Sequence, residues 1–180
     1  MKKVLFIFDQ LVDSDIEWMI TFGRTRSARA GEFLIQEGTT LQDIFIVLSG
    51  AFSIRAALLG SREVGRATSG EILGEMSFVD SRPTSASVVA LADSTVLAIP
   101  RAQMSKKLES DTGFAARFYR ALALLLSEKV RARSGLLPHG DEAVLDENVT
   151  AADEIDSAVL DEVHLAGARF EEMLKRLAPR

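Results

Sequence analysis

Short apolar runs separated by glycines fill the middle of this chain, and they restrict its fold more than any other feature. Between Phe22 and Pro100 the hydrophobic period is two, which is typical of half-buried strands. Glycine marks the turns between such strands, and in this region it recurs at positions 31, 38, 50, 60, 65, 70 and 74. Many short strands joined by glycine turns favour a β-barrel or β-sandwich.

Helical periodicity flanks the strand region on both sides. Ser14 with Glu17 three residues later is a capping-box pattern, which predicts a short N-terminal helix. After Pro100 the pattern predicts a short helix over 101–108 and a long helix over 113–133. A last apolar stripe predicts an amphipathic C-terminal helix, and Gly167 within it indicates close packing against another element.

We therefore expect one mainly β domain with flanking helices, followed by an appendage. The domain is expected over residues 1–133, with the strands at about 22–100 and helices over 101–133. An acidic linker is expected over 134–152 and the C-terminal helix over 153–178. From Ser134 to Glu162 there are nine acids and no Lys or Arg, a charge run typical of a solvated linker.

Composition excludes several classes of function. The chain has no cysteine, which excludes a disulfide framework and a thiolate metal site. Its two histidines, His139 and His164, are isolated, so no metal site is expected. No Gly-x-Ser-x-Gly elbow and no Walker lysine occur, so no catalytic residues and no enzyme activity are expected.

The apolar runs also bear on location. Val4–Phe8 is too short for the hydrophobic region of a signal peptide, and Ala121–Leu126 is too short to cross a bilayer. We expect a cytoplasmic protein without membrane insertion. Nucleic-acid binding is not expected either, because the acidic C-terminal region repels phosphates.

The run from Gly74 to Val88 has the character of an anion-binding loop. Gly74 allows close backbone approach, and Glu75 to Phe78 can form one helical turn whose free N–H groups point at a phosphate. Pro83 then breaks the loop and an alternating strand follows.

Three segments resemble the cyclic-nucleotide-binding domain shared by catabolite activator proteins, cyclic-nucleotide-dependent kinases and related channels. Residues 30–38 (AGEFLIQEG) resemble its opening turn and strand, and residues 45–50 (FIVLSG) resemble its next strand. Gly74-Glu75 with residues 83–88 (PTSASV) resembles its phosphate-binding cassette. The resemblance covers roughly residues 10–133 and implies a β-roll, that is, a jelly roll or double-stranded β-helix, with an N-terminal helix and a long C-helix.

The resemblance implies a site for cyclic AMP or cyclic GMP. Glu75 stands where the family accepts a hydrogen bond from the ribose 2′-hydroxyl, and Ser127 matches a base-contacting serine of the long helix. Cassette backbone N–H groups hold the phosphate, and Ser85 matches a residue that touches phosphate or base. The candidate ligand-binding residues are Gly74, Glu75, Met76, Ser77, Arg82, Thr84, Ser85 and Ser127.

Thr84 stands where the family places an arginine directly after the cassette proline. A cyclic phosphodiester is always negative, and removal of its cationic partner typically costs about 2–5 kcal/mol. We therefore expect weak binding or none, with the Thr84 and Ser85 hydroxyls recovering only part of the loss. Arg82, two residues upstream, is the alternative cation.

The long helix carries an apolar stripe wider than one core contact needs, which is typical of a helix pair across a two-fold axis. Resemblance to catabolite activators implies a homodimer through this helix. The candidate interface residues are Phe118, Leu122, Leu125, Leu126 and Lys129.

Two hypotheses of function follow. The first is a regulatory module that senses a cyclic nucleotide and acts through a protein partner. The chain resembles the small bacterial members that lack a DNA-binding domain, a group associated with bacteriocin-type peptide export, so an export system is a candidate partner. The alternative is a docking scaffold that kept the fold and lost the ligand.

Overall fold

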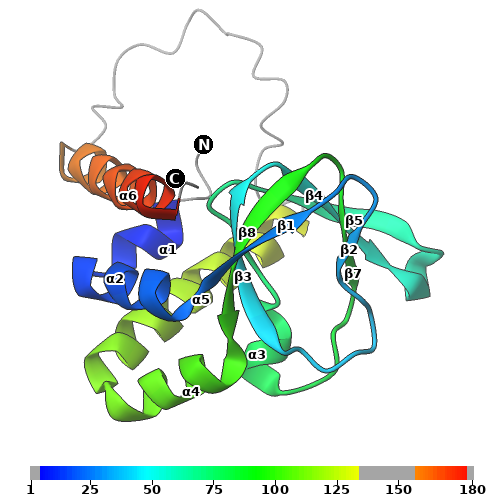
Figure 1. Ribbon diagram of the computed structural model, residues 1–180, viewed down its shortest axis with the longest axis horizontal. Coiled ribbons are helices and arrows are strands. Elements are labelled where there is room, and N and C mark those ends of the chain that lie inside the picture. Colours follow the sequence, from blue (N-terminus) through cyan, green and yellow to red (C-terminus); the bar gives the residue numbers. More distant parts are fainter. Residues whose placement is uncertain (1–4, 134–156, 178–180) are drawn as a thin grey trace, which may run out of the picture.

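The computed structural model describes residues 5–133 and 157–177, and the linker expected over 134–152 lies outside them (Figure 1). Two four-stranded antiparallel sheets form a β-roll. In one sheet the strand order is β1 (Arg24–Ala28), β8 (Ser94–Pro100), β3 (Asp43–Ser49) and β6 (Ile72–Leu73). In the other sheet the order is β2 (Phe33–Ile35), β7 (Ser87–Ala90), β4 (Ala51–Ala56) and β5 (Arg62–Thr68). The predicted mainly β fold is confirmed.

Helices cover one side of the roll. Five of them are α1 (Leu5–Gln10), α2 (Asp13–Phe22), α4 (Arg101–Ser110), α5 (Thr112–Arg133) and α6 (Ser157–Leu177), while α3 (Glu75–Asp80) lies within the strand region. A short 3₁₀ turn, Ala57–Leu59, joins β4 to β5. Residues 43–48 of β3 are buried on both faces, because strand neighbours and the helical layer enclose them. The core therefore reaches from the inside of the roll to α5.

The N-terminal region forms two helices rather than the single one predicted. The capping assignment to Ser14 and Glu17 is wrong, because α2 already begins at Asp13. Its first turn is closed by Asp15, whose carboxylate accepts a hydrogen bond from the backbone N–H of Val12 at 3.0 Å. Asp15 is fully buried, and its carboxylate also receives two hydrogen bonds from Arg117 of α5.

The amphipathic C-terminal helix expected from the sequence is present as α6, and it packs against α1 and α2 of its own chain (Figure 1). Phe170 is buried, with its ring centroid 5.2 Å from that of Phe8. At the rim, Arg176 pairs with Glu17 at 2.9 Å. This hydrogen bond from Arg176 holds the pKa of the Glu17 carboxyl below its usual value.

Gly167 has no packing reason in α6, contrary to the expectation from the sequence. A Cβ added at Gly167 would meet no atom within 4 Å. Replacing Gly167 with alanine is therefore expected to stabilise the helix by up to about 1 kcal/mol, because alanine loses less backbone entropy than glycine on becoming helical. Hydrogen exchange of the α6 amides measures the gain. Ala168→Gly, at the neighbouring exposed position, should weaken the helix by a similar amount, and equal exchange in both variants would contradict the prediction.

Candidate functional site

The cassette predicted from the sequence forms the short helix α3, as the resemblance implies. Gly74 precedes it with φ 88° and ψ 4°, a left-handed conformation that glycine adopts without strain. A Cβ at Gly74 would also lie 3.0 Å from the side chain of Leu41, so both the backbone conformation and the available space favour glycine here. First-turn amides of α3 thus belong to a helix end, where N–H groups have no partner within the helix.

Glu75 is bound to the long helix. Its side chain is 6% exposed, and its Oε1 lies 2.6 Å from the Nζ of Lys129 on α5. The negative charge that the resemblance assigns to a ribose hydroxyl is therefore compensated within the chain. Lys129, which the sequence analysis placed at a dimer interface, makes this contact inside its own subunit.

Arg101, which sequence reasoning missed, holds the other end of α3. It donates hydrogen bonds to the carbonyl of Ser77 at 2.9 Å and to the hydroxyl of Ser81 at 2.8 Å. Its guanidinium also lies 5.3 Å from the ring centroid of Phe78. An arginine at the last carbonyls of a helix stabilises that end. No local pattern around Arg101 indicates this role, because its partners lie more than one element away.

Thr84 is buried and forms a bridge between the end of the cassette and the loop after β2. Its hydroxyl donates to the carbonyl of Gln36 at 2.5 Å and accepts from the N–H of Thr39 at 3.2 Å. Two backbone hydrogen bonds, with Gly38 and Thr39, reinforce the contact. The hydroxyl proton of Thr84 is already donated to the backbone, so this group is not a free donor for a phosphate.

Replacing Thr84 with valine is expected to lower the free energy of unfolding by about 1–2 kcal/mol. The change keeps the shape of the side chain but leaves the Gln36 carbonyl and the Thr39 N–H without this partner. We expect the low end of the usual range, because Gln36 and Thr39 are exposed and water replaces part of the loss. Urea unfolding measures the change. Ser85→Ala, at an exposed neighbouring position, is the control; an equal loss there would refute the bridge.

The other candidate ligand residues are scattered. Arg82 has an 83% exposed side chain whose Nε lies 3.8 Å from Asp80, so it is a solvated residue and not a cation held over the cassette. Ser85 and Ser127 are exposed, whereas Ser77 is buried. Met76 is 48% exposed. The structure brings together Gly74, Glu75 and the first turn of α3, and it leaves Arg82 outside.

The candidate dimer residues are mostly core residues. Phe118, Leu122 and Leu125 are at most 3% exposed within the single chain, so they cannot form an open interface. Their burial has a simple cause: α5 packs against α1 and α4, and these three side chains belong to the same hydrophobic cluster as the inner residues of the strands. Leu126 remains partly accessible.

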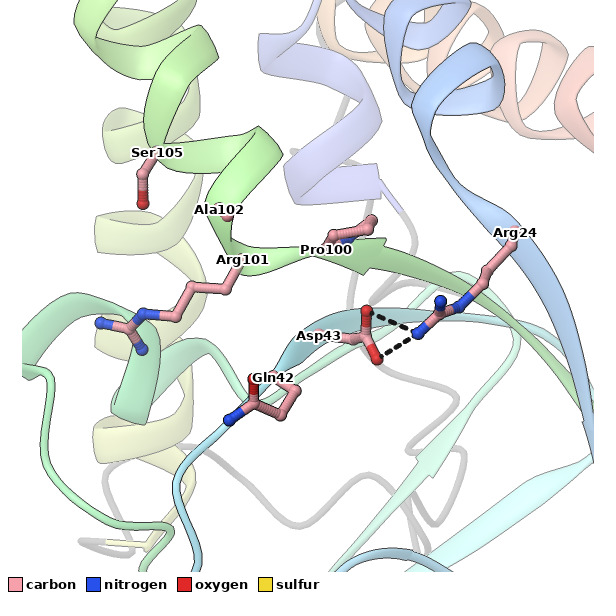
Figure 2. A pocket seen from close by; sticks show the side chains of 7 residues that line it. All are labelled: Arg24, Gln42, Asp43, Pro100, Arg101, Ala102 and Ser105. Atoms are coloured by element: carbon pink, nitrogen blue, oxygen red, sulfur yellow. Dashed lines mark hydrogen bonds and ion pairs between the residues drawn. The ribbon is translucent and has the colours of Figure 1, made fainter.

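A shallow hollow of about 520 Å³ lies between the ends of β1, β3 and β8 and the start of α4, and it is lined in part by Arg101, which also binds α3. Figure 2 shows Arg24 and Asp43 paired within it, with Arg24 Nη2 2.9 and 3.1 Å from the two carboxylate oxygens. The Arg101 side chain extends away from this pair, toward α3. The charged side chains that line the hollow thus already have partners, and the hollow contains none of the nucleotide contacts expected from the sequence.

Residues 5–133 and 157–177 contain neither a metal-binding cluster nor a membrane-spanning helix. Within these ranges no group of three or more His, Asp or Glu side chains is arranged to hold a metal ion. Of the helices in the same ranges, none combines the length and the apolar character needed to cross a membrane.

Comparison with solved structures identifies the same fold. Residues 25–111 match the family model described as the cyclic nucleotide-binding domain. The Thermus thermophilus catabolite activator protein superposes with a TM-score of 0.61 at 26% identity, over 73% of this chain and 61% of that one. A cyclic nucleotide-binding domain from Methylobacillus flagellatus superposes with a TM-score of 0.67 at 19% identity, over 76% of this chain and 81% of that one.

Two curated proteins are similar in sequence. The Pycsar effector protein XpPycTIR of Xanthomonas perforans is 25% identical over 114 residues, which are 63% of this chain and 37% of the effector. The Pycsar effector protein BcPycTIR of Burkholderia cepacia is 35% identical over 81 residues, which are 44% of this chain and 26% of the effector. The matches thus span well under half of the length of either effector.

Proposed function

Residues 25–111 form a cyclic nucleotide-binding domain, as the resemblance in the sequence predicted, and from this we propose that the chain is a non-enzymatic regulatory module whose ligand site is coupled to helix α5. One observation carries the proposal: the Lys129–Glu75 ion pair joins the cassette directly to α5. The names of the two curated relatives, both effector proteins, support a signalling role.

The coupling follows from the hydrogen-bonding capacity of the carboxylate. Lys129 binds Oε1 of Glu75, and a ribose hydroxyl that donates to the same carboxylate draws on the same negative charge, so each contact weakens the other. Ligand binding therefore weakens the contact that holds the end of α5 against the cassette, and the helix shifts toward a released state. A protein partner that contacts α5 reads this shift, and a peptide export system is one candidate for that partner.

Affinity is expected to be low, because no cation of the cassette faces the phosphate. Thr84 bridges to the backbone, Arg82 is solvated, and Arg101 is held at the opposite end of α3. Removing a buried cationic partner costs about 2–5 kcal/mol of binding free energy. This cost would move a micromolar dissociation constant into the range of tens of micromolar to millimolar.

Titration calorimetry with 3′,5′-cyclic nucleotides carrying each of the four common bases tests the proposal. We expect saturable binding of at least one of them, and at least a tenfold loss in Glu75→Gln, because a neutral amide is a weaker acceptor for the ribose hydroxyl. Glu128→Gln, on α5 near Lys129, is the matched control and should bind as the parent does. A linear 5′-monophosphate serves as the ligand control. Absence of heat with every cyclic nucleotide at millimolar concentration would refute ligand sensing.

The second candidate function is a docking scaffold without a ligand. It is favoured by the finding that Glu75 and Thr84 both have partners within the chain, so the cassette is electrostatically satisfied when empty. In that case the absence of heat is the expected result, and function resides in the helical surfaces.

A homodimer through α5 remains part of the proposal, with a different set of contact residues. The accessible side of the helix carries apolar residues at spacings of three, four, three and four, which is the pattern of a two-helix seam. Tyr119 is 48% and Val130 63% exposed, and the alanines between them allow two helices to approach closely. The proposed seam consists of Ala116, Tyr119, Ala123, Leu126 and Val130.

A further inference from the structure

Helix α6 lies against the corner where α1 ends and α2 begins, on the side of the helical layer that faces away from the β-roll (Figure 1). Its contacts with this corner are of two kinds, a largely enclosed arginine and an apolar stripe. The residues that make these contacts belong neither to the cassette nor to the proposed dimer seam, so they indicate a separate role.

Arg169 occupies a socket made only of acceptors. Its Nη1 donates to the carbonyl of Phe8 at 3.0 Å and to that of Asp9 at 3.4 Å, and its Nε pairs with the carboxylate of Asp13 at 2.8 Å. The two carbonyls belong to the last turn of α1, where they have no partner within the helix. Asp13 is the first residue of α2. A planar, five-donor guanidinium matches such a set of acceptors, and the Arg169 side chain is only 13% exposed.

An apolar stripe continues from this socket along α6. Ala166, Phe170 and Met173 are buried against the corner, and Arg176 pairs with Glu17 two turns after Arg169. Contacts one turn apart along a single helix face are the pattern by which a groove binds an amphipathic helix. The acidic rim, Asp13 and Glu17, complements the two arginines of α6.

Several features make this occupant exchangeable. Asp13 and Glu17 are 85% and 61% exposed, and ion pairs with exposed partners contribute little to stability. Gly167 weakens the helix at a position where packing does not require glycine. Residues 134–156 connect α6 to α5, so a released α6 stays tethered and competes with a partner at high effective concentration.

We propose that the α1–α2 corner is a helix-docking groove with an arginine socket, and that α6 occupies it reversibly in place of a partner's helix. The partner it fits is an amphipathic helix with an arginine directly followed by an aromatic residue, and a second arginine seven positions after the first. Binding of that helix displaces α6. This groove does not depend on nucleotide binding, so the proposal stands or fails separately from ligand sensing.

A fluorescent peptide of residues 157–180, titrated with the full chain, tests the groove. The parent chain is expected to bind the peptide weakly, because its own α6 competes. Arg169→Ala in the chain releases the resident helix and is expected to tighten peptide binding at least tenfold. Adding Asp13→Ala to that chain removes part of the socket. We expect it to reverse at least half of the change in the logarithm of the peptide's dissociation constant.

Matched peptides and an opposite variant keep the test decisive. A peptide with Arg169→Ala should not bind, whereas one with Lys175→Ala, an exposed position on the same helix, should bind like the parent peptide. Gly167→Ala in the chain should stabilise the resident α6 and so make the chain bind the peptide more weakly than the parent does. Partial unfolding of a variant would not produce this result. Equal binding by the parent and Arg169→Ala chains, or by the two variant peptides, would overturn the proposal. So would a dimer that the peptide converts to monomers, because α6 would then be seated on a second copy.

Discussion

Replacing Phe118 with alanine is expected to lower the free energy of unfolding by about 3–5 kcal/mol, the usual cost of emptying a fully enclosed phenylalanine site. Phe118 has no exposed surface, and its ring centroid lies 5.6 Å from that of Phe114 and 6.1 Å from that of Phe78. Through Phe78 the ring supports α3 from behind, so the loss also loosens the cassette. Urea unfolding followed by circular dichroism measures the change.

The same measurement separates a core residue from an interface residue. If Phe118 belongs to the core, replacing it costs the same free energy of unfolding at low and at high protein concentration. A cost that grows with protein concentration would show instead that Phe118 is an interface residue. Ala123→Glu is the matched variant on the exposed side of α5. It should leave the unfolding of the monomer unchanged and, where the proposed seam forms, lower the mass measured by light scattering.

Replacing Arg117 with glutamine is expected to cost about 3 kcal/mol, because it leaves the carboxylate of Asp15 buried without its cation. Arg117 binds Asp15 through Nε at 2.7 Å and Nη2 at 2.9 Å, and the Asp15 side chain is 2% exposed. These hydrogen bonds raise the pKa of the Arg117 guanidinium. We place the cost at the low end of the range for buried pairs, since the arginine itself is partly exposed. Thermal unfolding of the full chain measures it.

A double-mutant cycle with Asp15→Asn isolates the pair from other contacts of its members. The double variant should be less destabilised than the two single effects added together, because it removes the unpaired charge as well as its partner. Arg120→Gln, at an exposed position on the same helix, is the control and should change stability little. Strict additivity of the two replacements would show that the pair does not join α2 to α5.

The alternating strand region and the two long C-terminal helices could be predicted because their patterns depend on neighbours within a few residues. The alternation between Phe22 and Pro100 predicted a barrel or sandwich of short strands, and the 3.6-residue stripes predicted α5 and α6. The β-roll itself was implied by the resemblance of three segments to a known family. Capping of the N-terminal helix was misjudged for a related reason. The helix begins at Asp13, and its first turn is closed by Asp15, whose carboxylate is also bound by Arg117, 102 residues away.

The candidate site likewise has features that follow from the local sequence and features that depend on distant partners. Local pattern was enough to predict the Gly74 turn and the position of Glu75 at the start of a helix, and the resemblance to the family showed that Thr84 replaces the usual arginine. The partners of these residues were out of its reach. Lys129 lies 54 residues from Glu75, and Gln36 lies 48 residues from Thr84.

Periodicity and turn residues are properties of a short segment, and in this chain they are enough to predict a mainly β domain with flanking helices. The resemblance of short segments to a family added the cassette and its missing arginine. Which charges meet is a property of packed elements. Only the folded chain pairs Lys129 with Glu75, buries Phe118 in its own core, and seats Arg169 at the α1–α2 corner. Each of these contacts exists because hydrophobic packing brings distant backbones together, and that packing depends on the whole set of elements rather than on any one of them.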